Sequence, residues 1–355
     1  MASPRELSDR WHPQILVRSE KKALEAVDPK YLVPLAPKAA WDGWFAIVIF
    51  PGDAPLRWLK AHFYNRAYTP GWYPLSLLEA IGESTEVLIT WGSRHEVEVH
   101  QHRFEGNTVS AESSPLSIAF EDSFLLEGTA PHYRMSFSLP GSEVSARFEF
   151  ETGWPIWWSR FGRLLQYVGQ HSKAFAELVT DEGTFGLEGL GVMEHVAGTA
   201  VPFDFTRAAP INFHWDVLAF EESTSPFDSA TGLSVGVEGK NVMPLRAGLR
   251  LPGHEPWRMR GLWVRYLETT VGRDLNDEEI MVPLRWQGKM RNLKGTFTYE
   301  ATAATPAAGI LPGGAMLGFD FTGRWVGRGS HALLFSGTGF TEYGDFSGRL
   351  AAGAR

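Results

Sequence analysis

The 355-residue chain is longer than one hydrophobic core usually extends, which favours two domains of about 150 to 200 residues. Hydrophobic residues make up 44% of the chain and charged residues 21%, as in globular proteins, and the net charge of −8 includes no basic run that would follow nucleic-acid phosphates. Cysteine is absent, which excludes disulfides, thiolate nucleophiles and cysteine-bound metals.

The N-terminal segment does not lead us to expect export or membrane insertion. Its first residues, MASPRELSDRWHPQ, lack the apolar region of a signal peptide, and the chain nowhere contains about eighteen consecutive apolar residues. We therefore expect a cytoplasmic protein without a transmembrane segment and without a nucleic-acid partner. Residues 17–27 predict a short N-terminal helix.

Most of the remaining chain alternates apolar and polar residues with a period of two. Such segments are short, and glycine, proline, asparagine and aspartate separate them at turn spacing. This pattern predicts a mainly β protein built from antiparallel sheets or barrels. The clearest segments are WFAIVIF, HEVEVHQHRF, YRMSFSL, VSARFEFE, INFHWDVLAF, GLWVRYLE, GTFTYEA, MLGFDFTGRW and HALLFSGTGF.

One of these strands could place three metal-ligand types on one face. Glu98, His100 and His102 alternate with Val97 and Val99, and ligands at this spacing can reach one ion. The two valines are expected to be the buried set, which leaves the histidine face in water. We therefore predict no metal site here and no cofactor elsewhere.

A helical pattern interrupts the strands near residues 158–181. Apolar residues recur there at spacings of three and four, from Phe161 to Val179, and GWPIWWSRF precedes them. This predicts an inserted helix that caps one end of a barrel, with a lid over an apolar cavity or contact with a membrane surface as alternatives. Trp157 and Trp158 are included among the candidate substrate-binding residues.

An unusual motif occurs twice, 148 positions apart. GLGVMEH at residues 189–195 and GTGFTEY at residues 337–343 both end in a glutamate followed by a histidine or tyrosine. Glycines two apart on a strand allow a neighbouring element to approach the backbone closely. The repeat predicts two similar domains, 1–204 and 205–355, whose first strands contain Trp44 and Trp215.

The first strand of the second half carries the best acid/base candidate. In FHWDV, His214 and Asp216 share one face of a strand, and Trp215 points to the other. The pair suits proton transfer, although a hydrogen-bonded histidine with a purely structural role is the alternative. Glu194 and Glu342 of the repeated motif are titratable groups that either act in the same chemistry or tie down neighbouring segments.

The duplicated layout resembles the two-domain lipocalin-like superfamily, which includes carotenoid 1,2-hydratases, AttH-type bacterial proteins, kievitone hydratases and fungal Diels-Alderases. The resemblance implies two lipocalin-like (calycin-type) β-barrel domains, with the ligand in an apolar pocket between or within the barrels. The catalytic candidates for such chemistry are the residues singled out above: His214, Asp216, Glu194 and Glu342. Substrate-binding candidates are Trp44, Trp157, Trp158, His195, Trp215 and Tyr343.

We expect a hydrophobic small-molecule ligand. The resemblance implies a cofactor-independent hydratase, dehydratase or cyclase that acts on a terpenoid, carotenoid or polyketide-like substrate. The alternative is a non-catalytic lipid or hydrophobic-metabolite binding protein, because barrels of this kind bind ligands by burial alone. A carbohydrate hydrolase with two carboxylates is a third hypothesis.

Overall fold

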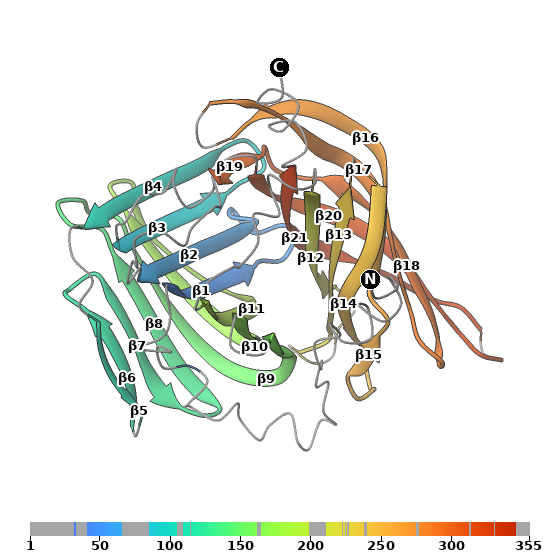
Figure 1. Cartoon of the computed structure of the whole chain (residues 1–355), viewed down its shortest axis with the longest axis horizontal. Coiled ribbons are helices and arrows are strands. Elements are labelled where there is room, and N and C mark those ends of the chain that lie inside the picture. The colour runs from blue at the N-terminus through green and yellow to red at the C-terminus, as the bar shows by residue number, and fades with distance from the viewer. Residues whose placement is uncertain are drawn as a thin grey trace, which may run out of the picture.

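A computed structural model describes residues 32, 41–65, 85–104, 109–113, 115–161, 165–198, 211–221, 223, 225, 227–237, 240–274, 277–311, 314–329 and 331–345. Within these residues the secondary structure is β-strand, in two antiparallel sheets (Figure 1). The predicted helix at residues 17–27 and the domain boundary at residues 204 and 205 lie outside the described residues, and the boundary stays a prediction.

The first sheet has eleven strands in the order β4-β3-β2-β1-β11-β10-β9-β8-β7-β6-β5. Its strands are β1 (Trp41–Ile49), β2 (Trp58–Asn65), β3 (Thr85–Gly92), β4 (Val97–Phe104), β5 (Ser110–Ser113), β6 (Leu116–Phe120), β7 (Phe124–Thr129), β8 (His132–Ser138), β9 (Ser145–Phe161), β10 (Leu165–Thr180) and β11 (Gly183–Gly198).

The second sheet repeats this topology in the order β15-β14-β13-β12-β21-β20-β18-β17-β16, and β19 adds to β20. Its strands are β12 (Ile211–Phe220), β13 (Ser229–Val237), β14 (Lys240–Arg250), β15 (Trp257–Met259), β16 (Leu262–Arg273), β17 (Glu279–Arg291), β18 (Gly295–Ala303), β19 (Ala308–Leu311), β20 (Gly314–Gly327) and β21 (Leu333–Asp345). In each sheet the first strand of the repeat pairs with the last, β1 with β11 and β12 with β21.

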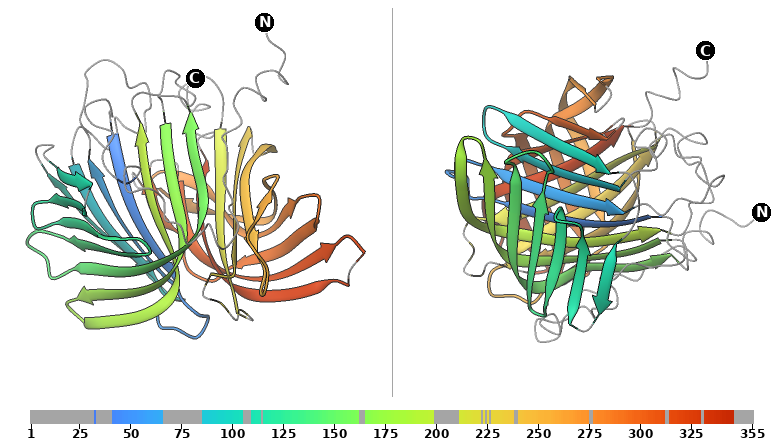
Figure 2. Two further views of the ribbon diagram at one scale, coloured as in Figure 1. Left: turned by 90° about the horizontal axis from the view of Figure 1, so that it is seen from below. Right: turned by 90° about the vertical axis from the view of Figure 1, so that its left-hand side faces the viewer.

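Both sheets are curled half-barrels rather than closed barrels (Figure 2). The first sheet ends at strands β4 and β5, and the second ends at β15 and β16; no pairing among the described residues joins those edges. The predicted barrel closure is therefore wrong, although the lipocalin-like arrangement of antiparallel strands is present. Closure would require edge-to-edge hydrogen bonds that these strands do not make.

The two copies of the glycine motif occupy equivalent positions in β11 and β21. Glu194 pairs with Phe45, and Glu342 pairs with Trp215 at the same place in the second sheet. A Cβ atom at Gly189 would lie 2.2 Å from the carbonyl oxygen of Ile49, and one at the matching glycine of β21 would lie 2.0 Å from that of Ala219. Glycine is needed because each strand crosses its neighbour this closely.

The register also corrects the match between the two tryptophans. Trp44 pairs with His195, whereas the equivalent residue in the second sheet, opposite Tyr343, is His214. Trp215 therefore lies one residue beyond the position of Trp44. A shift of one residue moves a side chain to the opposite face of the sheet.

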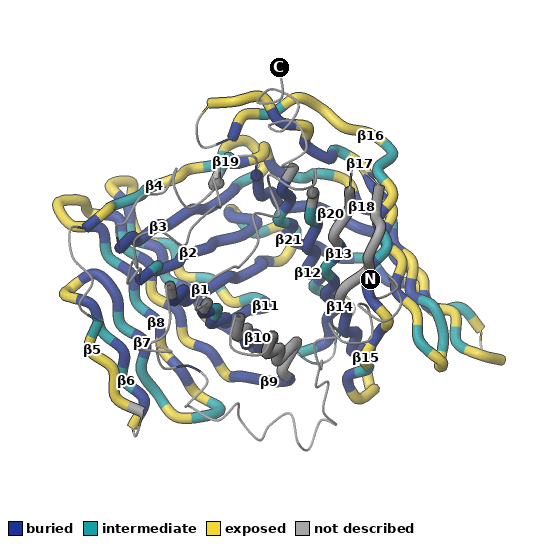
Figure 3. The backbone as a smooth tube through the Cα atoms, in the orientation of Figure 1, coloured by how far each residue is buried: buried dark blue, intermediate teal, exposed yellow. Residues whose placement is uncertain are grey.

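Three apolar clusters organise the molecule, and Figure 3 shows how the buried backbone follows them. One fills the inner face of the first sheet and contains Trp44, and a second fills the inner face of the second sheet and contains Trp286. The third joins the sheets through side chains such as Ile47, Val192 and Trp215. We call this third region the junction.

The predicted helix near residues 158–181 is wrong, because residues 158–161 are the end of β9 and residues 165–180 are β10. Strand β10 pairs with β9 on one side and with β11 on the other. Ala174, Ala176 and Leu178 alternate into the core, and the register between β9 and β10 shifts near Gly169 and Gln170. The apparent helical spacing combines two adjacent strands with this irregularity.

Candidate acid/base site

His214 and Asp216 lie side by side on the inner face of β12, as the alternation of the strand predicts. Nε2 of His214 is 2.8 Å from Oδ1 of Asp216. Both side chains are almost fully buried, at 1% and 0% exposure. A buried carboxylate keeps its charge only when it is paired and hydrogen-bonded, so the groups around Asp216 decide what this pair can do.

Two residues from neighbouring strands bind the second oxygen of Asp216. Nε1 of Trp286, on β17, donates to Oδ2 at 3.0 Å, and the hydroxyl of Tyr299, on β18, donates a short hydrogen bond to the same atom. Gly288 gives the ring of Tyr299 its space, because a Cβ atom there would lie 2.0 Å from the ring. Burial raises the pKa of Tyr299 well above 10, and the charge of Asp216 raises it further. Tyr299 therefore remains a donor.

The other ring nitrogen of His214, Nδ1, faces a less buried residue. Nδ1 is 3.3 Å from the hydroxyl of Tyr266 on β16, and Oγ1 of Thr341 lies 3.4 Å from Nε2. Tyr266 is half-buried and stands at a register shift between β16 and β17, where a bulge re-aims side chains. We call the set Tyr266, His214, Asp216, Trp286 and Tyr299 the relay, because its hydrogen bonds run without interruption from a half-buried hydroxyl to a buried carboxylate.

Two further candidates lie on these strands: Tyr343 lies beside the relay, whereas Trp215 lies on the other face of its strand. The ring of Tyr343 is 6.2 Å from His214 and 5.7 Å from Tyr266, so it forms part of the wall beside them. Trp215 points into the junction, where its Nε1 donates to Thr231 at 3.1 Å. Trp215 therefore contributes to the packing between the sheets.

Glu194 and Glu342 are separated from the relay by the sheet itself. Glu342 forms an ion pair with Lys60 of β2, and Lys60 is only 4% exposed. The ammonium group of Lys60 also lies 5.3 Å from the ring centre of Phe45 and 6.0 Å from that of Phe340. Glu194 occupies the equivalent position and is buried on the junction face of β11. The structure thus divides the four predicted catalytic residues between two faces.

The junction holds further buried histidines. Nε2 of His62 is 3.3 Å from Glu86, which also binds Arg103, and burial lowers the pKa of His62. His171 of β10 is bonded through Nδ1 to the hydroxyl of Ser229 in the second sheet. Burial lowers the pKa of His171 to about 3, so this histidine is neutral at ordinary pH.

The inner face of the first sheet has a His–Asp pair of its own. Nε2 of His195 is 3.2 Å from Oδ1 of Asp42, and Trp44 stacks on the imidazole with ring centres 4.9 Å apart. Nε1 of Trp44 donates to the carbonyl oxygen of Leu32 at 2.9 Å. Trp44 and His195 therefore lie together, but in the other half of the molecule from the relay.

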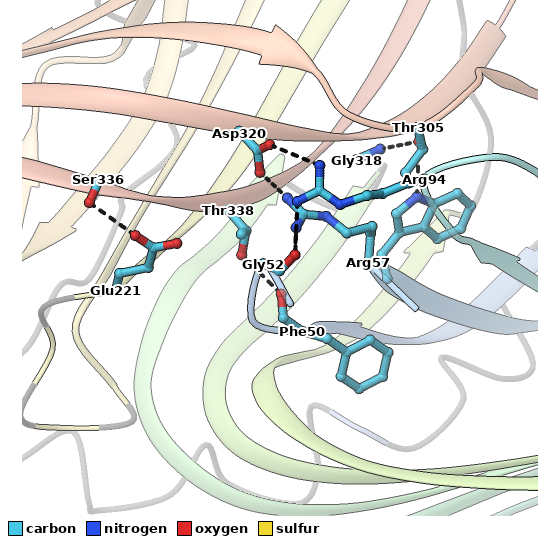
Figure 4. A network of polar contacts seen from close by, with 11 residues as sticks. Phe50, Gly52, Arg57, Arg94, Glu221, Thr305, Gly318, Asp320, Ser336 and Thr338 are labelled. Atoms are coloured by element: carbon cyan, nitrogen blue, oxygen red, sulfur yellow. Dashed lines mark hydrogen bonds and ion pairs between the residues drawn. The ribbon is translucent and has the colours of Figure 1, made fainter. Parts of the chain in front are cut away.

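An arginine network fastens the two sheets at one end of the junction (Figure 4). Arg57, which is 1% exposed, forms an ion pair with Asp320 and donates to the carbonyl oxygen of Gly52. Thr338 donates to the carbonyl oxygen of Phe50 at 3.0 Å. Burial lowers the pKa of Arg57, and the nearby charge of Arg94 lowers it further. These contacts hold β20 and β21, and β21 pairs with β12, the strand that carries His214 and Asp216.

The other predictions concern metals, membranes and two tryptophans. The side chains of Trp157 and Trp158 lie outside the described part of the chain. On β4, Val97 is half-buried and packs against the junction, but Val99 is exposed while His100 is half-buried and stacks on Trp91, so the expected burial is wrong for Val99. No group of three His, Asp or Glu side chains suited to a metal occurs among the described residues. Nor does any helix of that part of the chain reach the length and apolarity needed to cross a membrane.

Sequence reasoning missed Tyr266, Trp286 and Tyr299. Each occupies the inward position of its strand, as the alternation in GLWVRYLE and GTFTYEA indicates for the two tyrosines. A group able to donate a hydrogen bond on an otherwise apolar face is the available signal. Only the long-range strand pairing shows that all three meet at His214 and Asp216.

Comparison with known proteins supports the fold. No family model matches the sequence. No curated protein matches it significantly. Among solved structures, kievitone hydratase from Nectria haematococca matches with 12% identity and a TM-score of 0.57, over 95% of this chain and 98% of that one. An AttH-type protein from Nitrosomonas europaea matches with 10% identity and a TM-score of 0.55, over 88% and 95%. The predicted resemblance to the two-domain lipocalin-like superfamily is confirmed in the fold.

Proposed function

We propose that the protein is a cofactor-independent enzyme of the hydratase, dehydratase or cyclase type, and that the relay is its acid/base centre. The observation that carries this proposal is the hydrogen-bonded series from Tyr266 through His214 to Asp216. Asp216 orients the imidazole and stabilises its charged form, while Trp286 and Tyr299 hold Asp216. Tyr266 is the member that reaches the less buried end, so it is the group that meets the substrate.

The relay can move a proton in either direction without a cofactor. In hydration, the Tyr266 proton passes to one alkene carbon, and the Nδ1 proton of doubly protonated His214 replaces it. Water adds its oxygen to the other carbon, and the proton that this water releases returns through Tyr266 to His214. Dehydration is the reverse. In cyclisation, a second alkene replaces water, and the proton that the product loses returns by the same route.

The aromatic surroundings of the relay support a proposal for the substrate class. The rings of Tyr266, Trp286 and Tyr343 lie around His214, and ring faces stabilise a developing carbocation. We propose a hydrophobic terpenoid, carotenoid or polyketide-like substrate. The name of the solved kievitone hydratase supports hydration as the first reaction to test.

The test is an untargeted assay in water enriched in heavy oxygen. The purified protein is incubated with an apolar metabolite extract of its own host, and with kievitone as one defined compound, and the products are separated by mass spectrometry. We expect a product that is heavier by one labelled water for hydration, lighter by one water for dehydration, or isomeric for cyclisation. Tyr266→Phe should slow its formation about a hundredfold, because general acid/base groups contribute about that much or more.

His195→Gln is the matched control for His214→Gln, because both histidines are buried and bonded to an aspartate. The proposal requires that His214→Gln stops product formation while His195→Gln leaves it within about threefold. An extract compound that co-purifies unaltered, with no product from any fraction, would instead identify a non-catalytic binding protein and overturn the proposal.

A further inference from the structure

The outer face of the second sheet is strongly basic, although the chain as a whole is acidic. Residues 256–267, 284–299 and 321–341 contain nine lysines and arginines and no aspartate or glutamate, in a chain of net charge −8. These segments form or flank β16, β17, β18, β20 and β21. We call their outward cations the basic face: Arg265, Lys289, Arg291, Lys294, Arg324 and Arg328.

Strand register brings these cations together. One row across five strands runs through paired residues in the order Trp263, Lys289, Thr298, Arg324 and Leu334. Neighbours in such a row are about 5 Å apart. The row crosses a groove of about 820 Å³, which Arg265 of the next row also lines. Two cations therefore face one groove between a tryptophan and a leucine, and a third stands beside them.

Glu300 is the one carboxylate among the described residues that line this groove, and it is paired with Arg285 at 3.1 Å, so within that set the groove's cations lack carboxylate partners. On the first sheet, exposed arginines such as Arg134 and Arg147 bind glutamates. Within the described residues, Arg265, Lys289 and Arg324 form no such ion pair, and Arg291 lies over the ring of Trp263 at 4.9 Å. Unpaired positive charge concentrated in a groove attracts an anionic partner.

Apolar side chains project beside the same charges. Leu334 is 74% exposed and Leu293 is 67% exposed, more than any other large hydrophobic residue described. The turns that end β17 and β20 are joined, because the amide of Arg328 donates to the carbonyl oxygen of Lys294 at 3.0 Å. The projecting ends of the second sheet are seen at the right of Figure 1, and Figure 3 colours them largely as exposed.

We propose that the basic face docks on an anionic lipid bilayer. Lipid phosphates would occupy the groove between Lys289 and Arg324, and Leu293 and Leu334 would enter the interfacial region. Cations alone would suit any polyanion, but exposed leucines beside them favour a surface with an apolar interior. This inference goes beyond the acid/base chemistry, because it concerns where the protein resides when it meets apolar molecules.

Flotation of the intact protein with lipid vesicles tests the proposal without any turnover assay. We expect binding to phosphatidylcholine vesicles that contain about one third phosphatidylglycerol, weak binding to phosphatidylcholine alone, and loss of binding at high salt. The double variant Lys289→Glu and Arg324→Glu should lower the partition coefficient at least about tenfold. Leu293→Ser with Leu334→Ser should also lower it severalfold, by about the loss of two apolar insertions.

The matched controls carry the same changes elsewhere on the surface. Arg147→Glu with Lys173→Glu reverses two exposed charges of the first sheet, and Val271→Ser removes an exposed apolar side chain from the far end of β16. Both should bind like the parent protein, and circular dichroism shows that every variant is folded. Equal binding to both vesicle types, no binding at all, equal loss in test and control variants, or binding of inorganic phosphate without vesicles would each overturn the proposal.

Discussion

The two inner faces carry His–Asp pairs with different surroundings, and the proposed function assigns the chemistry to the pair of the second sheet. In the first sheet, His195 lies between Asp42 and the ring of Trp44, whose only polar atom is bound to Leu32. In the second sheet, His214 uses both nitrogens, one for Asp216 and one for the half-buried Tyr266. The pair of the second sheet continues to a half-buried hydroxyl, and a hydrogen-bonded series of this kind can deliver a proton.

Replacing each aspartate by asparagine tests this comparison, and it should give the largest difference in rate between the two pairs. Asp216→Asn removes the charge that stabilises protonated His214, and we expect product formation to fall about a thousandfold, or about 4 kcal/mol in the barrier. Asp42→Asn should leave the rate within about threefold. The rates are measured in the heavy-oxygen assay on variants with matched circular dichroism, and equal losses in both variants would contradict the distinction between the pairs.

Substituting Glu342 tests whether the junction face takes part in the reaction, because Glu342 is next to Tyr343 in sequence but faces the junction. Glu342→Gln leaves the charge of Lys60 buried without its partner, and we expect it to lower the free energy of unfolding by about 3 kcal/mol. The rate of the folded enzyme should stay within about threefold. Urea unfolding measures the first effect and the heavy-oxygen assay the second.

The control for this effect is the double variant Lys60→Met with Glu342→Leu, which removes both charges and should recover most of the stability. A large loss of rate at unchanged stability would show that Glu342 takes part in the reaction after all, as the sequence first suggested.

The smallest expected effect is on the pH dependence of stability, and it comes from His171, a buried histidine bonded to a serine. Its pKa is about 3 in the folded protein and about 6.5 when unfolded, so only the unfolded chain binds its proton between these values. The free energy of unfolding should therefore fall by about 1.4 kcal/mol per pH unit as the pH drops below about 6.5.

His171→Asn keeps a hydrogen-bonding group beside Ser229 and should reduce the slope by about 1.4 kcal/mol per pH unit, as measured by urea unfolding at about pH 7 and about pH 5, while buried His62 still contributes a slope of the same sign. The exposed His132 provides the control, and His132→Asn should keep the slope of the parent protein. If His171→Asn also keeps the full slope, another group is responsible for the acid sensitivity.

Local patterns predicted the strand content and the shared face of His214 and Asp216, because both depend only on the period of a strand. The equivalence of β11 and β21 was predicted from the repeated glycine motif. The error near residues 158–181 also arises from a local pattern. Apolar residues from two adjacent strands, with a register shift between them, imitate helical spacing over a short window.

The rest of the site depends on contacts between distant segments. Trp286 and Tyr299 meet Asp216 across separations of 70 and 83 residues, and Lys60 meets Glu342 across 282. The basic face is likewise dispersed over three segments, each with too few charges to form a run. Strand order and register create both features, and neither is contained in any single stretch of sequence.

A crystal structure with a bound reactant or product is the most direct test of the central claim that the relay is the reacting centre. The account predicts that a reacting carbon or hydroxyl of the ligand lies within hydrogen-bonding distance of the Tyr266 hydroxyl, on the inner side of the second sheet. A reacting group found instead beside Lys60 and Glu342 at the junction, with Tyr266 out of contact, would contradict it.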